Sequence, residues 1–196
     1  MNSREEILNA VVDNQPINVP LPEIGFLDSE YIYLAETFIN TLTGIGGNVV
    51  PVENMLDVQA YILQKFYISS RTVTTVRSLK NVAELLLKYS TPSHGLNNID
   101  YAIIDSHCAV AENGAVWVTE KGIGYNRVLP FICQHLAVVV NARDIVPNMH
   151  AAYEVINTDD YGYGTFIAGP SKTADIEQSL VLGAHGPRSM TVFLMM

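Results

Sequence analysis

The sequence predicts an α/β fold built on a largely parallel sheet, and three observations support this prediction. Short apolar, β-branched runs alternate with stretches of helical periodicity over most of the 196 residues. The C-terminal segment Thr165 to Met195 has the pattern strand, turn, helix, turn, strand. The Asn113-Gly114 dipeptide indicates a tight hairpin, so at least one antiparallel pair joins the parallel majority.

The first 28 residues are expected to form a separate appendage. Ser3 can cap a short helix, Ser3–Val12, with Glu6 three residues after the cap. Residues 14–28 are rich in Pro, Asn and Gly, which is typical of a linker or an extended arm. Residues 29–196 are then expected to form one α/β domain, a length that buries a substantial core.

The elements of this domain follow from the spacing of apolar residues and from the turn residues between them. Helices are expected at Ser29–Leu42, at Asp57–Phe66, at Asn81–Tyr89, within Ala142–Ile156 and after the Gly169-Pro170 turn. Strands are expected at Asn48–Val52, Thr72–Val76, Tyr101–Val110, Ala115–Thr119, Leu136–Val140, Thr165–Ala168 and after Gly186-Pro187. A Tyr- and Gly-containing loop is expected at residues 159–164.

Composition excludes several classes of function. The net charge is −9, and residues 1–60 carry nine acids against one base, which argues against nucleic acid or an anionic membrane as partner. No apolar run is long enough to span a membrane, and the acidic N-terminus is not a secretory signal, so a cytoplasmic protein is expected. Cys108 and Cys133 lie in apolar runs and are expected to be buried, reduced thiols.

No metal or cofactor is expected on this chain. An iron–sulfur cluster needs four ligands, usually thiolates, and the chain has two cysteines. Cys133 and His135 are spaced to share an ion, but two ligands do not make a zinc site. Asp105, Ser106 and His107 are the residue types of a catalytic triad, yet neighbours within one strand do not reach the relay geometry.

The turn from Gly169 to Glu177 is the first candidate ligand site. Gly169 permits close approach of a ligand to the backbone, and Ser171 or Thr173 can cap a helix whose N-terminal N–H groups attract anions. Asp175 and Glu177 complicate this interpretation because acids there already satisfy the helix dipole. A capped helix without a ligand is therefore the simpler alternative.

Two further turns carry ionisable side chains. His185 and Arg188 flank Gly186-Pro187, where the arginine suits a carboxylate or phosphate and the histidine titrates near neutral pH. A surface turn without a ligand is an equal alternative there. Glu112 places a carboxylate at the expected hairpin tip, where plain turn chemistry is the simpler explanation.

These motifs resemble a known family. The segment Gly169 to Leu194 resembles the signature of the lactate-utilisation (LUD) domain, in its LutC/YkgG branch, and Ala111–Ala115 and Ser3–Leu8 resemble two further motifs of that branch. Lys172 stands where an arginine is expected. The resemblance implies a three-layer α/β/α fold of the NagB/RpiA/CoA-transferase-like group. Within the motifs, the candidate catalytic residues are Glu112, Asp175 and His185, and the candidate ligand-binding residues are Gly169, Ser171, Thr173, Glu177 and Arg188.

Two functions follow from the resemblance and the residues. The first is a cluster-free, LutC-like subunit that supports oxidation of L-lactate to pyruvate, with oxidoreductase and iron–sulfur partners that carry the clusters. The second is an enzyme or regulator that binds a small anion, such as a nucleotide, a CoA-like molecule or an organic acid. Convergence of Glu112, Asp175 and His185 in one cleft would favour the second function, and scattered positions would favour the first.

Overall fold

A computed structural model describes residues 2–20, 22, 33–65, 71–86, 92–156, 162–173 and 183–196. The chain divides into two compact units, Met1–Glu30 and Tyr31–Met196, and each is described by itself. Over the described ranges, no helix has both the length and the apolar character needed to cross a membrane.

The first unit contains helix α1, Ser3–Asp13, close to the predicted range. Its N-terminal cap is Asn2 rather than the expected Ser3. The Asn2 side chain accepts the Glu5 N–H at 3.0 Å, and the Glu5 carboxylate accepts the Asn2 N–H at 3.1 Å. Asn2 takes this role because its extended backbone, with ψ of 159°, places its side chain over the first turn.

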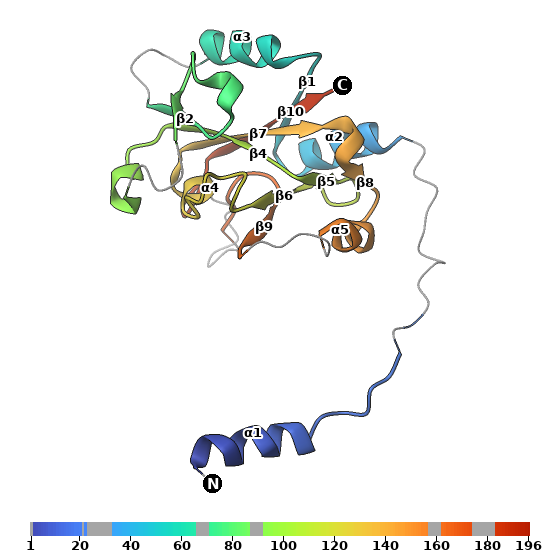
Figure 1. Ribbon diagram of the computed structural model, residues 1–196. Helices are drawn as coiled ribbons and strands as arrows, with labels where there is room; N and C mark the ends of the chain where they lie inside the picture. The colour runs from blue at the N-terminus through green and yellow to red at the C-terminus, as the bar shows by residue number, and fades with distance from the viewer. Residues whose placement is uncertain are drawn as a thin grey trace. The chain divides into compact units, whose positions relative to one another are not determined.

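The second unit is built on a six-stranded sheet in which every neighbouring pair is parallel. This sheet confirms the predicted α/β class and the largely parallel strand arrangement. The C-terminal strand β10 lies between β1 and β7, so the end of the chain is a central element of the sheet (Figure 1). In spatial order the strands are β1 (Asn48–Val52), β10 (Ser189–Met195), β7 (His135–Asn141), β4 (Tyr101–Asp105), β2 (Thr72–Thr74) and β3 (Glu84–Leu85).

A second, four-stranded sheet is the main feature that the sequence did not indicate. Its strands, in spatial order, are β8 (Ile145–Val146), β5 (Cys108–Val110), β6 (Ala115–Thr119) and β9 (Gly164–Ile167). The predicted strand Tyr101–Val110 is in fact two strands, because the chain leaves the first sheet at Ser106 and enters the second at His107. Ser106 donates its N–H to Val139 of β7 at 3.2 Å, and His107 donates its N–H to Trp117 of β6 at 2.9 Å.

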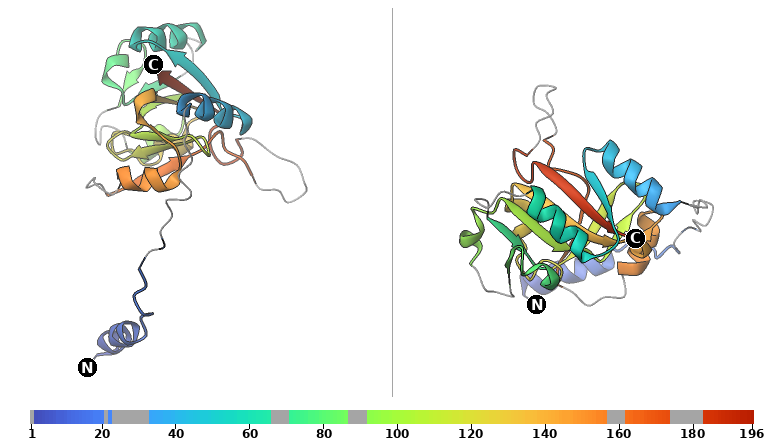
Figure 2. Two further views of the ribbon diagram at one scale, coloured as in Figure 1. Left: turned by 90° about the vertical axis from the view of Figure 1, so that its right-hand side faces the viewer. Right: turned by 90° about the horizontal axis from the view of Figure 1, so that it is seen from above.

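Helices cover both faces of the six-stranded sheet. Helix α3 (Met55–Lys65) lies over one face, and α2 (Leu34–Gly44), α4 (Leu129–Ile132) and the second sheet lie against the other (Figures 1 and 2). Helix α5 (Met149–Ile156) packs on the outer side of the second sheet. The six-stranded sheet is therefore the middle layer of the domain, as the predicted three-layer fold requires.

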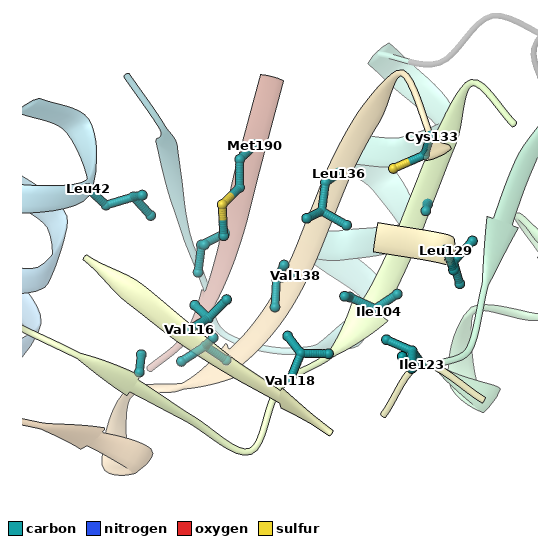
Figure 3. Close-up of a cluster of buried hydrophobic side chains, with 14 of the residues drawn as sticks. Leu42, Ile104, Val116, Val118, Ile123, Leu129, Cys133, Leu136, Val138 and Met190 are labelled. Atoms are coloured by element: carbon teal, nitrogen blue, oxygen red, sulfur yellow. The ribbon is translucent and has the colours of Figure 1, made fainter. Parts of the chain in front are cut away.

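The main core lies between the two sheets, where side chains of both sheets meet (Figure 3). Leu136 and Val138 of β7 face Val116 and Val118 of β6 there, and all four are at most 2% exposed. A smaller cluster around Phe193 packs beneath α3, and a third packs beneath α5.

Both cysteines are buried, as predicted. Cys133 lies in the core between the sheets and Cys108 lies beneath α5. Burial raises the pKa of the Cys133 thiol to about 12 and that of Cys108 to about 11. Because thiolates are the reactive form, these values indicate unreactive, structural thiols.

The predicted helix Asn81–Tyr89 is wrong over the residues that the structure describes. Val82 and Ala83 both donate their N–H groups to Leu79 in a turn, and Glu84 begins the short strand β3. The Arg71 guanidinium binds both carboxylate oxygens of Glu84 at 3.1 Å. Pairing with β2 and this bidentate contact thus override the helical propensity of the segment.

Candidate functional site

The two Gly-Pro turns of the C-terminal motif pack against each other. Ser171 donates its N–H to the Pro187 carbonyl at 2.9 Å, and Gly183 donates its N–H to the Ser171 carbonyl at 2.9 Å. These turns lie where β10 begins. The motif is therefore at the amino ends of the parallel strands, which we call the amino edge of the six-stranded sheet. Asp175 and Glu177 are outside the described residues, and their expected roles stay predictions.

Gly169 and Gly114, from two separate motifs, both pack on the C-terminal half of α2. Gly169 has φ of +72°, and a Cβ there would lie 3.2 Å from the Ile45 carbonyl oxygen. Gly114 has φ of +68°, and a Cβ there would lie 2.9 Å from the Leu42 Cα. The described contacts of both glycines therefore serve packing of the chain against a helix.

Glu112 stabilises a helix end. Its carboxylate accepts the Met149 N–H, at the start of α5, at 2.7 Å, and its own N–H donates to Pro147 at 3.1 Å. Asn148 completes the cap by accepting the Ala151 N–H at 2.9 Å. None of the described contacts of Glu112 involves His185, and a catalytic role for Glu112 stays a prediction without support from its geometry.

The Glu112→Ala protein is expected to be less stable by about 0.5–2 kcal/mol, because the first N–H of α5 loses its acceptor. Urea denaturation followed by circular dichroism measures the difference. Glu112→Gln is the matched control, since its amide oxygen can still accept the N–H, and it should lose less. Unchanged stability of Glu112→Ala would show that the contact does not contribute.

The remaining predicted residues lie at the surface or beside the same turns. His185 and Arg188 are exposed, and Thr173 is half-buried. Arg188 donates its N–H to Gln134 at 2.7 Å, and its charge lies close enough to His135 to lower the pKa of that imidazole. The structure thus brings Gly169, Ser171 and Arg188 together at the amino edge. In parallel α/β sheets, however, ligands usually bind at the carboxyl ends of the strands.

A cavity of about 380 Å³ lies at the carboxyl ends of the parallel strands, beyond the last residues of β2 and β4. We call it the carboxyl-edge pocket. Such placement, at the carboxyl ends of adjacent parallel strands, is typical of ligand sites in this fold class. Its lining residues are Thr75, Val76, Arg77, Asp105, Ser106, His107, Thr119, Lys121 and Gly122.

Short contacts hold the walls of the carboxyl-edge pocket together. The Thr75 hydroxyl donates to the Gly122 carbonyl at 2.6 Å, and the Gly122 N–H donates to the Thr119 hydroxyl at 3.3 Å. A Cβ on Gly122 would lie 2.8 Å from the Asp105 carbonyl oxygen, so the loop after β6 packs tightly on the end of β4. Side chains on this frame lie at strand ends and in the loops that these contacts fix.

The charges of the carboxyl-edge pocket suit a small anion. Arg77 and Lys121 are exposed, and over the described part of the chain neither has a carboxylate within ion-pair distance. Asp105 and His107 line the same cavity. Two cations can hold a carboxylate or phosphate, while a carboxylate and an imidazole can accept a proton. Among the described residues, no group of three or more His, Cys, Asp or Glu side chains could hold a metal ion.

The pKa of the Asp105 carboxyl group is raised above its usual value. Partial burial of its carboxyl group raises its pKa, and the Asp144 carboxylate raises it further, while the Ser106 N–H and His107 act in the opposite direction. A carboxyl group with a raised pKa at the mouth of a cavity is a candidate for proton transfer.

Asp105→Asn is expected to stabilise the protein at pH 7. The pKa of Asp105 is raised in the folded state. Its charged form therefore destabilises the folded state at pH values above this raised pKa. The destabilisation disappears at pH values below the usual pKa range of a carboxyl group. The gain should be less than about 1 kcal/mol, since the residue is exposed and solvent screens it. Thermal denaturation of both proteins at pH 7 and near the usual carboxyl pKa tests this. An equal difference at both pH values would contradict it.

The sequence contained the signals for the carboxyl-edge pocket, but the strand assignment concealed them. The apolar pattern predicts one strand through Asp105, Ser106 and His107, and Arg77 belongs to no sequence motif. The structure ends β4 at Asp105, so these side chains sit on a strand-to-loop junction. Polar residues directly after two buried strands are the pattern that would have predicted this site.

Comparison with known proteins agrees with this fold. Residues 91–195 match the sequence model of a family described as the LUD domain. Lactate utilization protein C of Geobacillus sp. strain WCH70 is 37% identical over 111 residues, covering 50% of this chain and 46% of that protein. The same-named protein of Bacillus pumilus strain SAFR-032 is 34% identical over 93 residues, covering 44% and 38%. The aligned chain thus spans less than half the length of these relatives.

A solved structure supports the fold alone. The crystal structure of a DUF162 family protein from Deinococcus radiodurans superposes with a TM-score of 0.59 at 14% sequence identity. The superposition covers 83% of this chain and 96% of that chain. At that identity the arrangement of layers is shared, and the functional residues have to be argued from this chain itself.

Proposed function

The chain belongs to the LUD domain family, and from that membership we propose that it takes part in lactate utilisation. In the finer form of the proposal it is a LutC-like component, without a cluster of its own, that supports the oxidation of L-lactate to pyruvate. That oxidation removes two electrons and two protons from lactate. Iron–sulfur clusters on partner proteins, together with which this chain would act, would accept those electrons.

One observation indicates which residues would bind lactate. Arg77 and Lys121 lack described carboxylate partners and line the same cavity as Asp105 and His107. A 2-hydroxy acid presents a carboxylate beside a hydroxyl group. The two cations bind the carboxylate, and Asp105 or His107 accepts the hydroxyl proton. The carboxyl-edge pocket is thus chemically matched to lactate.

The size of the same cavity favours a second candidate function. About 380 Å³ lies within the range of roughly 300–1,000 Å³ that is typical of sites for drug-sized ligands. A three-carbon acid leaves much of that volume unfilled. This supports an enzyme or regulator that binds a larger anion, such as a nucleotide, a CoA-like molecule or a larger organic acid, in the carboxyl-edge pocket.

Growth on L-lactate tests the biological role. A strain of the source organism that lacks this gene is complemented with the wild-type gene or with the Arg77→Met variant. Lys80→Met is the matched control, because Lys80 is an exposed cation close in sequence that does not line the cavity. We expect wild type and Lys80→Met to restore growth and Arg77→Met to fail at equal protein level. Normal growth of the deletion strain on lactate would overturn the role.

Ligand binding tests the choice between the two functions. Thermal stability of the pure protein is measured against L-lactate, pyruvate, ATP, NAD, CoA and folates, since a ligand that binds the native state raises the melting temperature. A rise with lactate or pyruvate supports the first function. A rise only with a larger anion supports the second, and purification with tagged partners then shows whether both roles coexist.

A further inference from the structure

A second cavity, of about 220 Å³, lies at the opposite edge of the six-stranded sheet, beneath the C-terminal end of α3. We call it the amino-edge pocket, and we propose that it is a binding site for a small oxyanion. This inference is independent of the proposed function and of the carboxyl-edge pocket. The polar side chains that line it are Tyr61, Lys65, Tyr101, His135, Ser189 and Thr191.

A row of polar residues crosses the sheet at this place. Tyr101, His135 and Ser189 begin β4, β7 and β10 and stand in register on these three adjacent strands. The Tyr101 and His135 rings stack with centroids 4.6 Å apart, and Nδ1 of His135 lies 2.7 Å from the Ser189 hydroxyl. Each side chain in the row is thus fixed by its neighbour.

The cavity lies where the next row of the sheet is small on β7 and β10, while Ile103 fills the same row on β4. Ala137 and Thr191, in register with each other, follow two residues after His135 and Ser189 on the same face. Farther along this face, Val139 and Phe193 pack into the apolar cluster beneath α3. The Tyr61 ring packs against Phe193, but the hydroxyl, imidazole and ammonium groups around the space add polar atoms to an otherwise apolar face, which points to a ligand.

The His135–Ser189 contact holds the imidazole ring at the wall of the cavity. When the Ser189 hydroxyl donates to Nδ1, the neutral imidazole carries its proton on Nε2 and offers an N–H group. Burial lowers the pKa of His135 and the Arg188 charge lowers it further, while Asp100 acts in the opposite direction, and the lowered pKa favours the neutral ring. The Thr191 hydroxyl provides a further donor in the same space.

The charge around the cavity is positive. Lys65 lies on the α3 side, with its ammonium group 5.9 Å from the Tyr61 ring centroid. Helical side chains lean toward the N-terminus, so this ammonium group lies one turn back from the carbonyls that end α3. Arg188 adds a second cation beside His135. The negative charge of Asp100 acts against these two cations, and its carboxylate accepts the backbone N–H of Arg71 at 2.8 Å.

The size of the cavity limits the ligand to a small anion. About 220 Å³ is below the roughly 300 Å³ at which sites for drug-sized molecules begin. The donors, which are an ammonium group, an imidazole N–H and hydroxyl groups, match an oxygen-rich anion such as phosphate or a short carboxylate. Phosphate and a short carboxylate share this chemistry, and the experiment below distinguishes between them.

Ring resonances of the histidines in the full-length protein test the proposal. The protein with 13C-labelled histidine is titrated with inorganic phosphate and, separately, with acetate. We expect a saturable shift of the His135 ring with a Kd at or below about 10 mM for at least one anion. Lys65→Met should weaken that binding about tenfold, and Lys80→Met should leave it unchanged. Tighter binding of phosphate assigns a phosphate ligand, and tighter binding of acetate assigns a carboxylate.

The same spectra keep this test separate from the proposed function. His107 lines the carboxyl-edge pocket, and its ring reports that cavity independently of His135. No saturable shift of His135 with either anion would overturn the proposal, whatever His107 does. Equal affinity of wild type and Lys65→Met would also overturn it.

Discussion

The Arg77→Met protein is expected to bind L-lactate about 10- to 100-fold more weakly than wild type. A hydrogen bond to a charged group contributes about 1.5–3 kcal/mol, and each 1.4 kcal/mol is a factor of ten in Kd. Methionine keeps the length of the side chain but cannot donate to a carboxylate. Isothermal titration calorimetry at fixed salt concentration measures the change, since screening weakens exposed charges.

Two further variants sharpen this test. Lys121→Met, on the other side of the cavity, should also weaken binding, because both cations face the same ligand. Lys80→Met should bind lactate as wild type does, because Lys80 is outside the cavity. Wild-type affinity in the Arg77→Met protein would show that lactate does not use the carboxyl-edge pocket.

The Gly114→Ala protein is expected to lose about 2–4 kcal/mol of stability. The position has φ of +68°, which only glycine adopts without strain, and the new Cβ would lie 2.9 Å from the Leu42 Cα and 3.0 Å from the Leu42 N. Both atoms belong to the backbone of α2, so neither can move aside as a flexible side chain would. Thermal denaturation should show the midpoint falling by roughly 5–15 °C.

Gly44→Ala is the matched control for this prediction. Gly44 is the last residue of α2, and a Cβ there would meet nothing within 4 Å. The Gly44→Ala protein should be more stable than wild type by less than about 1 kcal/mol, because alanine is the better helix former. If Gly114→Ala matched this control, the hairpin tip would not be packed on α2 as described.

Much of the fold was predictable from local pattern. The strands β1, β6, β7 and β10 and the helices α3 and α5 lie within a few residues of their predicted ranges, because each has a clear apolar period and a turn residue at its end. The second sheet was not predictable. The polar residues Asp105, Ser106 and His107 interrupt Tyr101–Val110, but only the contacts of Ser106 with β7 and of His107 with β6 show that the chain changes sheets there.

The candidate site was predicted less well than the fold. The sequence pointed to unusual turn residues, and in the structure Gly169, Ser171 and Glu112 have contacts that stabilise turns and helix ends. Specific residue patterns arise from packing as readily as from ligands. Arg77 and Asp105 belong to no distinctive motif, so the sequence alone does not indicate their position. Their role depends on two strands that end at the same edge of the sheet, which is a property of topology.

A map of backbone amide shifts during titration with L-lactate tests the central claim most directly. The carboxyl-edge pocket predicts saturable shifts at Val76, Ser106 and Lys121, which belong to three separate segments that line this cavity. Shifts confined to Ser189 and Thr191 at the opposite edge, or no saturable shift at all, would contradict the claim that lactate binds at the carboxyl ends of β2 and β4.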